Sequence, residues 1–198
     1  MESGLPQHIL VEKARNGDQT AFEQLFRQTC QQIYNFLLAL ELTRDEAADV
    51  SQETFVKAWE SLSSLRSEDR FLPWLYQIAR NKAKDYIKAR SRKPVISIEL
   101  INAGALSESD NDPAGNALKS EKSSAVYASV LKLPEHQRLP VVMHHIQGMP
   151  VADIANALGV SFGTVLSRLA RGRAALARSL TPYIDGGASN SEGTTREL

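Results

Sequence analysis

Basic side chains gather in two separated stretches of this 198-residue chain. The first stretch, residues 80–93, holds seven lysines and arginines against a single acid, Asp85. The second stretch, residues 167–178, holds four arginines and no acid. Cationic side chains in such stripes attract the phosphates of a polyanion. One stripe would be read as an ordinary solvated helix face, but two stripes with so few acids favour nucleic-acid binding.

The second basic stretch lies inside a pattern that predicts a helix-turn-helix over residues 151–169. Gly159 supplies the left-handed turn residue that ends a first helix, and Ser161 is a good N-cap for a second. On the second helix, predicted from Phe162 to about Leu180, an apolar stripe faces the core and small or basic residues face away. Such a helix suits the major groove of DNA, with arginines that reach phosphates. The alternative is an ordinary pair of helices with a basic surface.

The first basic stretch lies on a helix predicted from near Pro73 to Arg90. Arg80, Lys84 and Lys88 share one face of this helix. The preceding loop, residues 64–71, is polar but carries the aromatic Phe71. A basic helix beside such a loop is able to hold a single strand with one unstacked base. The alternative for Phe71 is a place in the core, and this is the interpretation that we prefer for Trp74.

An acidic and amide cluster marks the helix predicted from Thr43 to about Leu62, which begins with a Thr43–Glu46 capping box. Its members, Asp49, Gln52, Glu53 and Glu60, lie away from the apolar stripe of the helix. A face of this kind is usually just solvated. Composition alone does not make it a protein-docking surface.

Composition and charge exclude several classes of protein. Lys plus Arg is 23 and Asp plus Glu is 23, and 42% of residues are hydrophobic, as in soluble globular chains. No run approaches the roughly 20 apolar residues of a membrane span, and the start of the chain has no signal-peptide pattern. Cys30 is the only cysteine, so an intramolecular disulfide is impossible. We therefore expect a soluble cytoplasmic protein.

The order of patterns along the chain predicts an all-α fold of two helical domains joined by a flexible linker. The first domain is predicted over residues 1–93 and the second over residues 122–180. Residues 94–121 are acidic and rich in Ser, Gly, Pro and Asn, which favours a linker. Residues 181–198 are predicted to form a disordered tail. The adjacent His144 and His145 point to different helix faces, so we predict no metal site, no cofactor and no enzymatic activity.

Several motifs, in order, resemble those of the extracytoplasmic-function (ECF) sigma factors of bacterial RNA polymerase. The N-terminal part carries Gly17-Asp18-x-x-Ala21-Phe22-x-x-Leu25-Phe26, Asp49-Val-Ser-Gln-Glu-Thr-Phe and Phe71-x-x-Trp74-Leu-x-x-Ile78-Ala-Arg-Asn-x-Ala83. The C-terminal part carries Leu133-Pro134-x-x-x-Arg138, Gly148-Met-Pro-Val-Ala-Asp-Ile-Ala and Leu158-Gly-Val-Ser-x-Gly-Thr-Val-x-Ser-Arg-Leu. These motifs span nearly all of residues 9–178 and match sigma region 2 and region 4.

The resemblance implies a factor that brings core RNA polymerase to promoters and helps to melt them. It implies docking on the beta-prime clamp through Asp49, Gln52 and Glu53, a contact with the beta flap, and usually an inhibitory anti-sigma partner. The residues that it implies for the −10 element are Arg66, Asp69, Arg70, Phe71, Arg80, Asn81, Lys84 and Lys88. The residues that it implies for the −35 element are Ser161, Gly163, Thr164, Ser167, Arg168, Arg171 and Arg173.

Two positions depart from the family pattern. Leu166 stands where a basic residue is frequent, and Ala170 stands where a large residue is common.

Two other classes of protein are alternatives to a sigma factor. A helix-turn-helix regulator acting without polymerase would explain residues 150–178 but not the acidic helix or the linker. An enzyme built around His144, His145 and Asp153 would lack a second carboxylate or a cysteine at its site.

Overall fold

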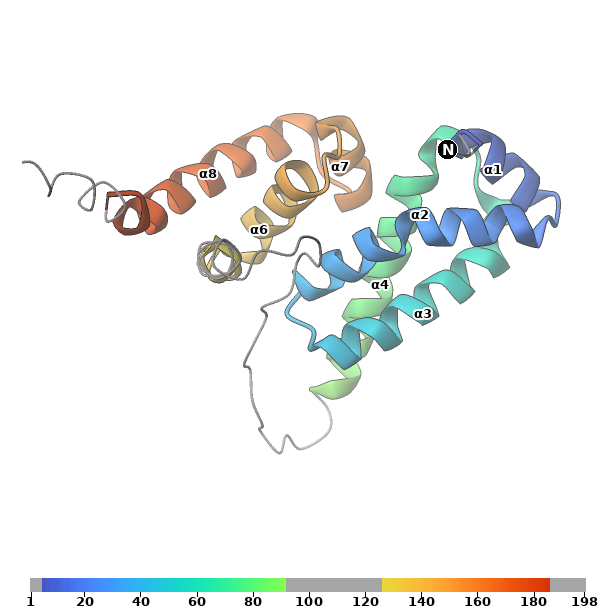
Figure 1. The fold of residues 1–198 in the computed structure, drawn as a ribbon, viewed down its shortest axis with the longest axis horizontal. Coiled ribbons are helices and arrows are strands. Elements are labelled where there is room, and N and C mark those ends of the chain that lie inside the picture. Colours follow the sequence, from blue (N-terminus) through green and yellow to red (C-terminus); the bar gives the residue numbers. More distant parts are fainter. Residues whose placement is uncertain (1–4, 92–125, 186–198) are drawn as a thin grey trace, which may run out of the picture.

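The computed structural model describes residues 5–91 and 126–185. Within these ranges every regular element is helical, as predicted (Figure 1). Short 3₁₀ turns at Leu62–Ser64 and Glu68–Arg70 precede α4, and residues 126–131 are also helical. The longer helices are α1 (Gln7–Arg15), α2 (Gln19–Leu38), α3 (Arg44–Ser61), α4 (Phe71–Arg90), α6 (Glu135–Val141), α7 (Val151–Leu158) and α8 (Phe162–Asp185).

Side-chain caps fix the starts of two long helices in the N-terminal domain, residues 5–91. The carboxylate of Asp18 accepts hydrogen bonds from the backbone N–H groups of Thr20 (2.9 Å) and Ala21 (3.1 Å) at the start of α2. The predicted capping box of α3 is confirmed: Glu46 N–H donates to the Thr43 hydroxyl, and Thr43 N–H donates to the Glu46 carboxylate. These bonds satisfy backbone donors that a helix start otherwise leaves free.

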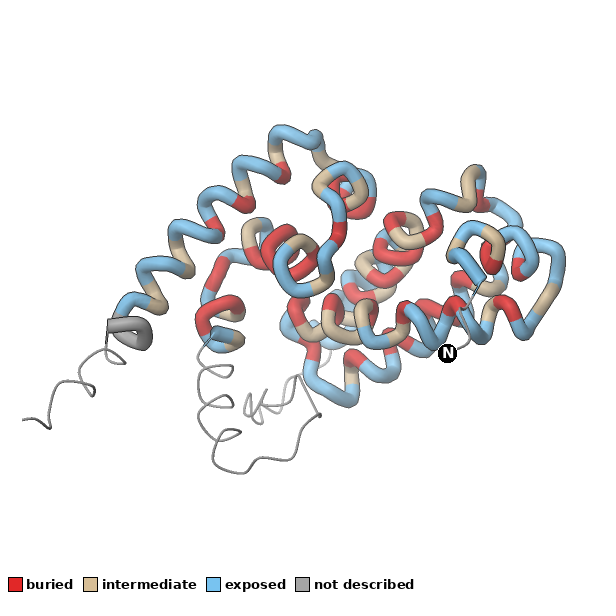
Figure 2. Tube along the Cα trace, turned by 45° about the horizontal axis from the view of Figure 1, so that its top comes forward, coloured by how far each residue is buried: buried red, intermediate tan, exposed pale blue. Residues whose placement is uncertain are grey.

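The core of the N-terminal domain lies between α1, α2, α3 and α4. Leu25, Phe36, Leu75 and Tyr76 are fully buried there, and the Phe36 and Tyr76 rings meet edge to face with centroids 4.9 Å apart. Figure 2 shows buried positions on the inner sides of these helices and exposed positions on their outer sides. This alternation is the one that amphipathic helices produce when each buries one face.

The C-terminal domain, residues 126–185, contains a break in its helical hydrogen bonding that the sequence predicted only as a bend at Pro140. Helix α6 passes at Val142 into a π-helical turn, Val142–Ile146, and the Gln147 N–H donates to the Val142 carbonyl at 3.1 Å. Proline lacks the amide donor and its ring crowds the preceding turn, so helices rearrange near it. The wide turn carries the chain to Gln147, which faces the N-terminal domain.

Two predicted helix boundaries need correction. Helix α4 begins at Phe71 rather than near Pro73, because the 3₁₀ turn before it runs directly into it. Helix α8 continues to Asp185, five residues beyond the predicted end, so the predicted tail is helical over residues 181–185. The predicted linker and residues 186–198 lie outside the described residues.

The two domains lie against each other, with α7 packed on α4. In Figure 1, α6 and α7 stand beside α2 and α4, while α8 runs along the outer side of the C-terminal domain. The Tyr76 hydroxyl donates to Gln147 Oε1 at 2.6 Å, and Gln147 Nε2 donates to the Gln32 carbonyl at 2.8 Å. One glutamine side chain therefore joins two helices of the other domain. None of the helices in the described part of the chain is both long and apolar enough to cross a membrane.

Candidate nucleic-acid interface

The predicted helix-turn-helix is formed by α7 and α8. Gly159 adopts φ +66°, the left-handed conformation that ends α7, and the next amide, Val160 N–H, donates to the Ala155 carbonyl at 3.0 Å. Ser161 then starts α8 by accepting a hydrogen bond from Thr164 N–H at 3.2 Å. Val165 and Leu169 of α8 are buried, as is Ile154 of α7, and the two helices pack against each other. The turn thus fixes the angle at which α8 presents its outer face.

That outer face carries the residues predicted for the −35 element. Ser161, Gly163, Ser167, Arg171 and Arg173 are exposed, and Thr164 and Arg168 are half-buried. Among the described residues, no carboxylate lies within ion-pair distance of any of the three arginines. A helix of this kind, exposed and without acids from residue 162 to residue 184, is able to enter a major groove, with its arginines directed at bases or phosphates.

Most residues predicted for the −10 element lie on the exposed side of α4 and of the turn before it. Arg66, Asp69 and Arg70 are exposed at the turn. Further along, Asn81, Lys84 and Lys88 are exposed on α4 itself. Since α4 advances about 1.5 Å per residue, Asn81 and Lys88 lie about 10 Å apart along its axis, a length that suits a few nucleotides of single strand.

Phe71, also predicted for the −10 element, does not lie on this exposed surface. The side chain is 0% exposed, and its ring packs near that of Trp74 with centroids 6.0 Å apart. Phe71 is the first residue of α4, where an aromatic ring closes the core beneath the preceding turn. In this structure Phe71 has the core position that the sequence offered as the alternative.

Arg80 is half-buried at the contact between the two domains rather than free on the surface. Its Nη1 donates to the Leu158 carbonyl at 3.0 Å, and the neighbouring Gln77 Nε2 donates to the Asn156 carbonyl at 2.7 Å. Both acceptors are carbonyls at the end of α7, where a helix leaves its last acceptors unpaired and concentrates partial negative charge. Arg80 Nε is buried without a hydrogen-bond partner among the described residues. In this arrangement the end of α7 engages the guanidinium group that the sequence predicted to contact DNA.

The acidic and amide cluster on α3 is exposed at Asp49, Gln52 and Glu53. Glu53 also pairs with Lys82 of α4, with 3.0 Å between Oε2 and Nζ. Lys82 was not among the predicted site residues, although opposite charges on neighbouring helices are the signal that would have found it. The cluster is therefore open to a partner and anchored at one point by the adjacent helix.

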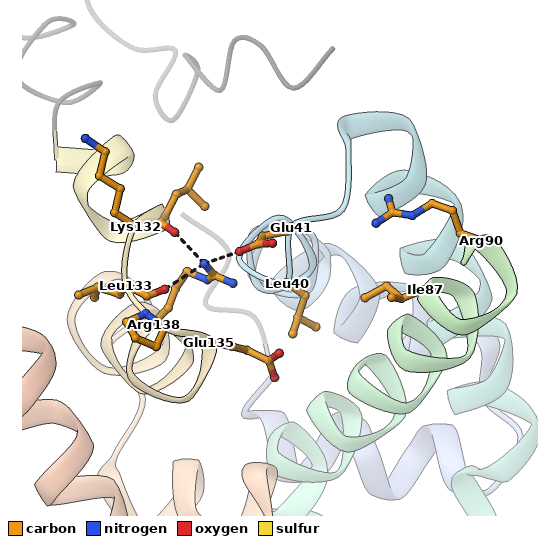
Figure 3. Close-up of a pocket in the computed structure, with 10 residues that line it drawn as sticks. Leu40, Glu41, Ile87, Arg90, Lys132, Leu133, Glu135 and Arg138 are labelled. Atoms are coloured by element: carbon orange, nitrogen blue, oxygen red, sulfur yellow. Dashed lines mark hydrogen bonds and ion pairs between the residues drawn. The ribbon is translucent and has the colours of Figure 1, made fainter. Parts of the chain in front are cut away.

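A buried arginine lies at the domain contact, a role that the sequence did not predict although the residue belongs to one of the motifs. Arg138 is only 4% exposed, and its Nε donates to the Ala39 carbonyl at 2.7 Å across the contact. Its Nη1 lies 2.7 Å from Glu41 Oε1 and also donates to carbonyls of its own domain, at Leu131 and Leu133 (Figure 3). Beside these groups is a pocket of about 540 Å³. No local sequence signal marks a contact between residues about 100 positions apart.

The two adjacent histidines form no metal site with their surroundings. His144 Nδ1 lies 3.0 Å from the Met149 carbonyl, and the two imidazole rings meet edge to face. Burial, together with His144 and the nearby Arg173, holds the pKa of His145 below its ordinary value. Within residues 5–91 and 126–185, no three His, Cys, Asp or Glu side chains gather as metal ligands would.

The fold and these two surfaces define a class of protein, the sigma-70-type initiation factors. Residues 25–93 match the family model described as Sigma-70 region 2, and residues 123–176 match the one described as Sigma-70, region 4. The first match contains α3 and α4, and the second contains the helix-turn-helix. Each predicted surface thus lies in the region to which the motifs assigned it.

Individual relatives narrow the class to one family. The ECF RNA polymerase sigma-E factor of Salmonella typhimurium is 34% identical over 191 residues, covering 93% of this chain and 99% of the relative. The RNA polymerase sigma-H factor of Pseudomonas aeruginosa is 32% identical over 181 residues, covering 88% and 94%. The chain belongs to the ECF family of RNA polymerase sigma factors. It is a promoter-specific initiation factor, and its family is not one of known enzymes.

A solved structure has the same arrangement of helices. The structure of CnrH in complex with the cytosolic domain of CnrY superposes with a TM-score of 0.65 at 28% sequence identity, and the match covers 89% of this chain and 97% of that chain. Because the match covers nearly the full length of both chains, it includes the two domains together and not only each region by itself.

Proposed function

We propose that this sigma factor works through three separate surfaces: the α3 cluster for core polymerase, the outer side of α4 for the −10 element, and α8 for the −35 element. The observation that carries the proposal most is the exposed, acid-free outer face of α8 behind a well-formed helix-turn-helix. A regulator that binds DNA alone would explain this helix, but it would give no role to the exposed cluster on α3.

The polymerase surface is proposed at Asp49, Gln52 and Glu53, with the beta-prime clamp as its partner and the beta flap as a further contact of the C-terminal domain. The three side chains are exposed and lie away from the buried face of α3. Their replacement by alanine should leave the fold intact while binding to core polymerase falls, because a small central cluster often carries much of an interface. Unchanged affinity for core in the triple variant would contradict the assignment.

The −10 surface is proposed at Arg66, Asp69, Arg70, Asn81, Lys84 and Lys88, with Arg80 joining when the domains separate. Its role is to hold the melted strand, since extraction of a base costs a few kcal/mol that a binding site must offset. Asn81→Ala should therefore slow open-complex formation on a duplex promoter more than on a pre-melted one. Equal defects on the two templates would indicate a loss of general affinity instead.

The experiment that tests the whole proposal compares DNA binding and transcription with and without core polymerase. We expect the purified chain to bind promoter duplexes weakly alone and selectively as holoenzyme, and we expect run-off transcription to depend on both elements. Equally selective binding by the isolated chain would favour the regulator that acts without polymerase.

An inhibitory anti-sigma protein and a cytoplasmic location complete the proposal. The CnrH structure contains the cytosolic domain of CnrY, so a protein of this fold is known with a partner chain bound. The two-domain packing described above covers Arg80, which supports a form of this protein in which promoter contacts are withheld. Co-purification of a partner that blocks core binding would test this part separately.

A further inference from the structure

Helix α8 exposes two large apolar side chains one turn apart. Phe162 is 54% exposed and Leu166 is 47% exposed, although both lie on a helix whose core positions, Val165 and Leu169, are buried. Ala170, one further turn along, is also exposed. Leaving large apolar groups in water forgoes the stabilisation that burial would give, so this row is better suited to a bound state than to the free protein.

The charges around the row indicate what covers it. From Phe162 to Ile184, α8 contains arginines but no aspartate or glutamate, and Arg171 and Arg173 are exposed beside the row. A polyanion therefore fits this face better than an acid-poor protein surface would. Phe162 is the first residue of α8, directly after the Ser161 cap, and the first turn of such a helix is the part that contacts base edges.

The major groove offers apolar side chains only one apolar group on the bases. Guanine, cytosine and adenine present hydrogen-bonding atoms there, whereas thymine adds its C5-methyl group. Neither Phe162 nor Leu166 has a side-chain atom that donates or accepts a hydrogen bond, so neither gains from the polar edges. Four residues of helix span about 6 Å, which is close to two base steps of about 3.4 Å.

We propose that Phe162 and Leu166, with Ala170 completing the row, select thymine in the −35 element by contact with its methyl group. The inference rests on the proposed role of α8 and adds the chemistry of its specificity. It also gives one explanation for both positions at which the sequence departs from the family pattern. A factor with a basic residue in place of Leu166 would reach a phosphate or a guanine, whereas this one favours A·T pairs.

The test uses the holoenzyme and promoter duplexes randomised in the −35 element. Binding selection should enrich thymine at one or two positions within about two base steps of each other. Each enriched thymine is then replaced by deoxyuridine, which keeps every hydrogen-bonding group and removes only the methyl group. We expect holoenzyme affinity to fall about 3- to 4-fold per critical methyl group, the factor that corresponds to about 0.8 kcal/mol.

Variants connect the effect to the residues. Phe162→Ala and Leu166→Ala should each lower affinity for the thymine duplex and abolish the penalty for deoxyuridine at the position contacted. Their salt dependence should match that of wild type, because no phosphate contact is lost, whereas Arg173→Ala should lower the salt slope by about 1. Ile146→Ala removes a comparably exposed apolar side chain outside α8 and should leave both properties unchanged.

Two results would overturn the inference. One is equal binding of thymine and deoxyuridine duplexes at every −35 position, and the other is full sensitivity to deoxyuridine in both alanine variants. In either case the row would be available to an apolar protein partner, which a loss of partner binding in the same variants would reveal. Failure of the proposed function is distinct, because wild-type holoenzyme would then show no −35 preference at all.

Discussion

At the scale of single residues, Glu46 links the start of α3 to the end of α4. Its carboxylate accepts a hydrogen bond from Thr43 N–H at 2.9 Å and pairs with Arg90 Nη1 at 2.9 Å. Burial on its own would raise the pKa of this carboxyl, but the donors at Thr43 and Arg90 outweigh burial and hold the pKa below its ordinary value. The charged form of Glu46 therefore stabilises the folded chain.

Replacing Glu46 by Gln should lower stability in a pH-dependent way. Because the folded pKa is lowered, the contribution is present above the unfolded pKa, near 4.5, and is lost as pH falls through the folded value. We expect Glu46→Gln, which keeps an acceptor for Thr43 N–H but removes the ion pair with Arg90, to cost about 0.5–1 kcal/mol at pH 7 and less in acid. Urea unfolding at pH 7 and pH 3.5 measures this, with the exposed Glu60→Gln on the same helix as control. A cost that does not change with pH would contradict the electrostatic explanation.

Phe71 allows a second test at this scale, because its burial assigns it to folding rather than to DNA. Phe71→Ala should lower the free energy of unfolding by about 3–5 kcal/mol, as large-to-small changes in a packed core do. Transcription by the variant should be reduced, relative to wild type, by the same factor on duplex and on pre-melted promoters. Denaturant unfolding gives the first quantity. Wild-type stability combined with a defect on the duplex template alone would restore Phe71 to the DNA surface.

At the scale of helices, α6 and α8 pack closely against each other at Gly172. A Cβ atom added there would lie 2.7 Å from Val141 Cγ2, whereas one added at Gly163 of the same helix would meet nothing within 4 Å. The Val141 side chain is buried and short, so it has little room to move. Glycine at residue 172 is thus needed for the approach of two helices, and glycine at residue 163 is not needed for packing.

The same substitution at these two glycines should have opposite effects on stability. Gly172→Ala should cost about 1–3 kcal/mol through overpacking. Gly163→Ala should gain about 0.5–1 kcal/mol, because alanine is the better helix former. Thermal and urea unfolding of the two variants, compared with wild type, give both values. Stabilisation by alanine at both positions would show that α6 moves aside without cost.

Local patterns were enough to predict most of the helices but not their irregular ends. The capping box at Thr43, the left-handed turn at Gly159 and the cap at Ser161 depend on neighbouring residues, and these were read correctly from the sequence. The π-helical turn after Pro140 and the continuation of α8 to Asp185 were not predicted. A proline disturbs a helix in several ways, and the choice among them depends on tertiary packing that local spacing does not contain.

At the scale of the whole molecule, the domain contact combines apolar packing with hydrogen bonds that water is able to replace. When the domains separate, Arg138 keeps the carbonyls of Leu131 and Leu133 and exchanges the Ala39 carbonyl and the Glu41 carboxylate for solvent. Glu41 has φ +63°, a left-handed conformation that costs a residue with a side chain roughly 1–2 kcal/mol. The ion pair between Glu41 and Arg138 joins the two domains, so it is present only while they are packed together.

The sequence predicted the separate surfaces better than their relation to one another. The outer face of α8 and the cluster on α3 are exposed as expected, because helical periodicity alone decides which side of a helix is apolar. The engagement of Arg80 by the Leu158 carbonyl could not be predicted, since it depends on how two domains pack. The sequence pattern of each surface therefore does not show which surfaces are accessible to a partner while the two domains are packed together.

Gln147 offers a test of whether this packing withholds Arg80 from the −10 surface. Gln147→Ala removes the acceptor of Tyr76 and the donor to the Gln32 carbonyl, and thus two hydrogen bonds across the contact, each worth about 1 kcal/mol. The domains should separate more often, which would free Arg80. We expect a broader distance distribution between spin labels at positions 57 and 174 in a Cys30→Ser background, and tighter binding of a single-stranded −10 oligonucleotide.

The matched control is Gln31→Ala. Gln31 is an exposed glutamine of α2, and its side-chain amide donates to Asn35 within the same helix. If label distances and oligonucleotide affinity in Gln147→Ala match those of the control, the contact does not limit access to Arg80.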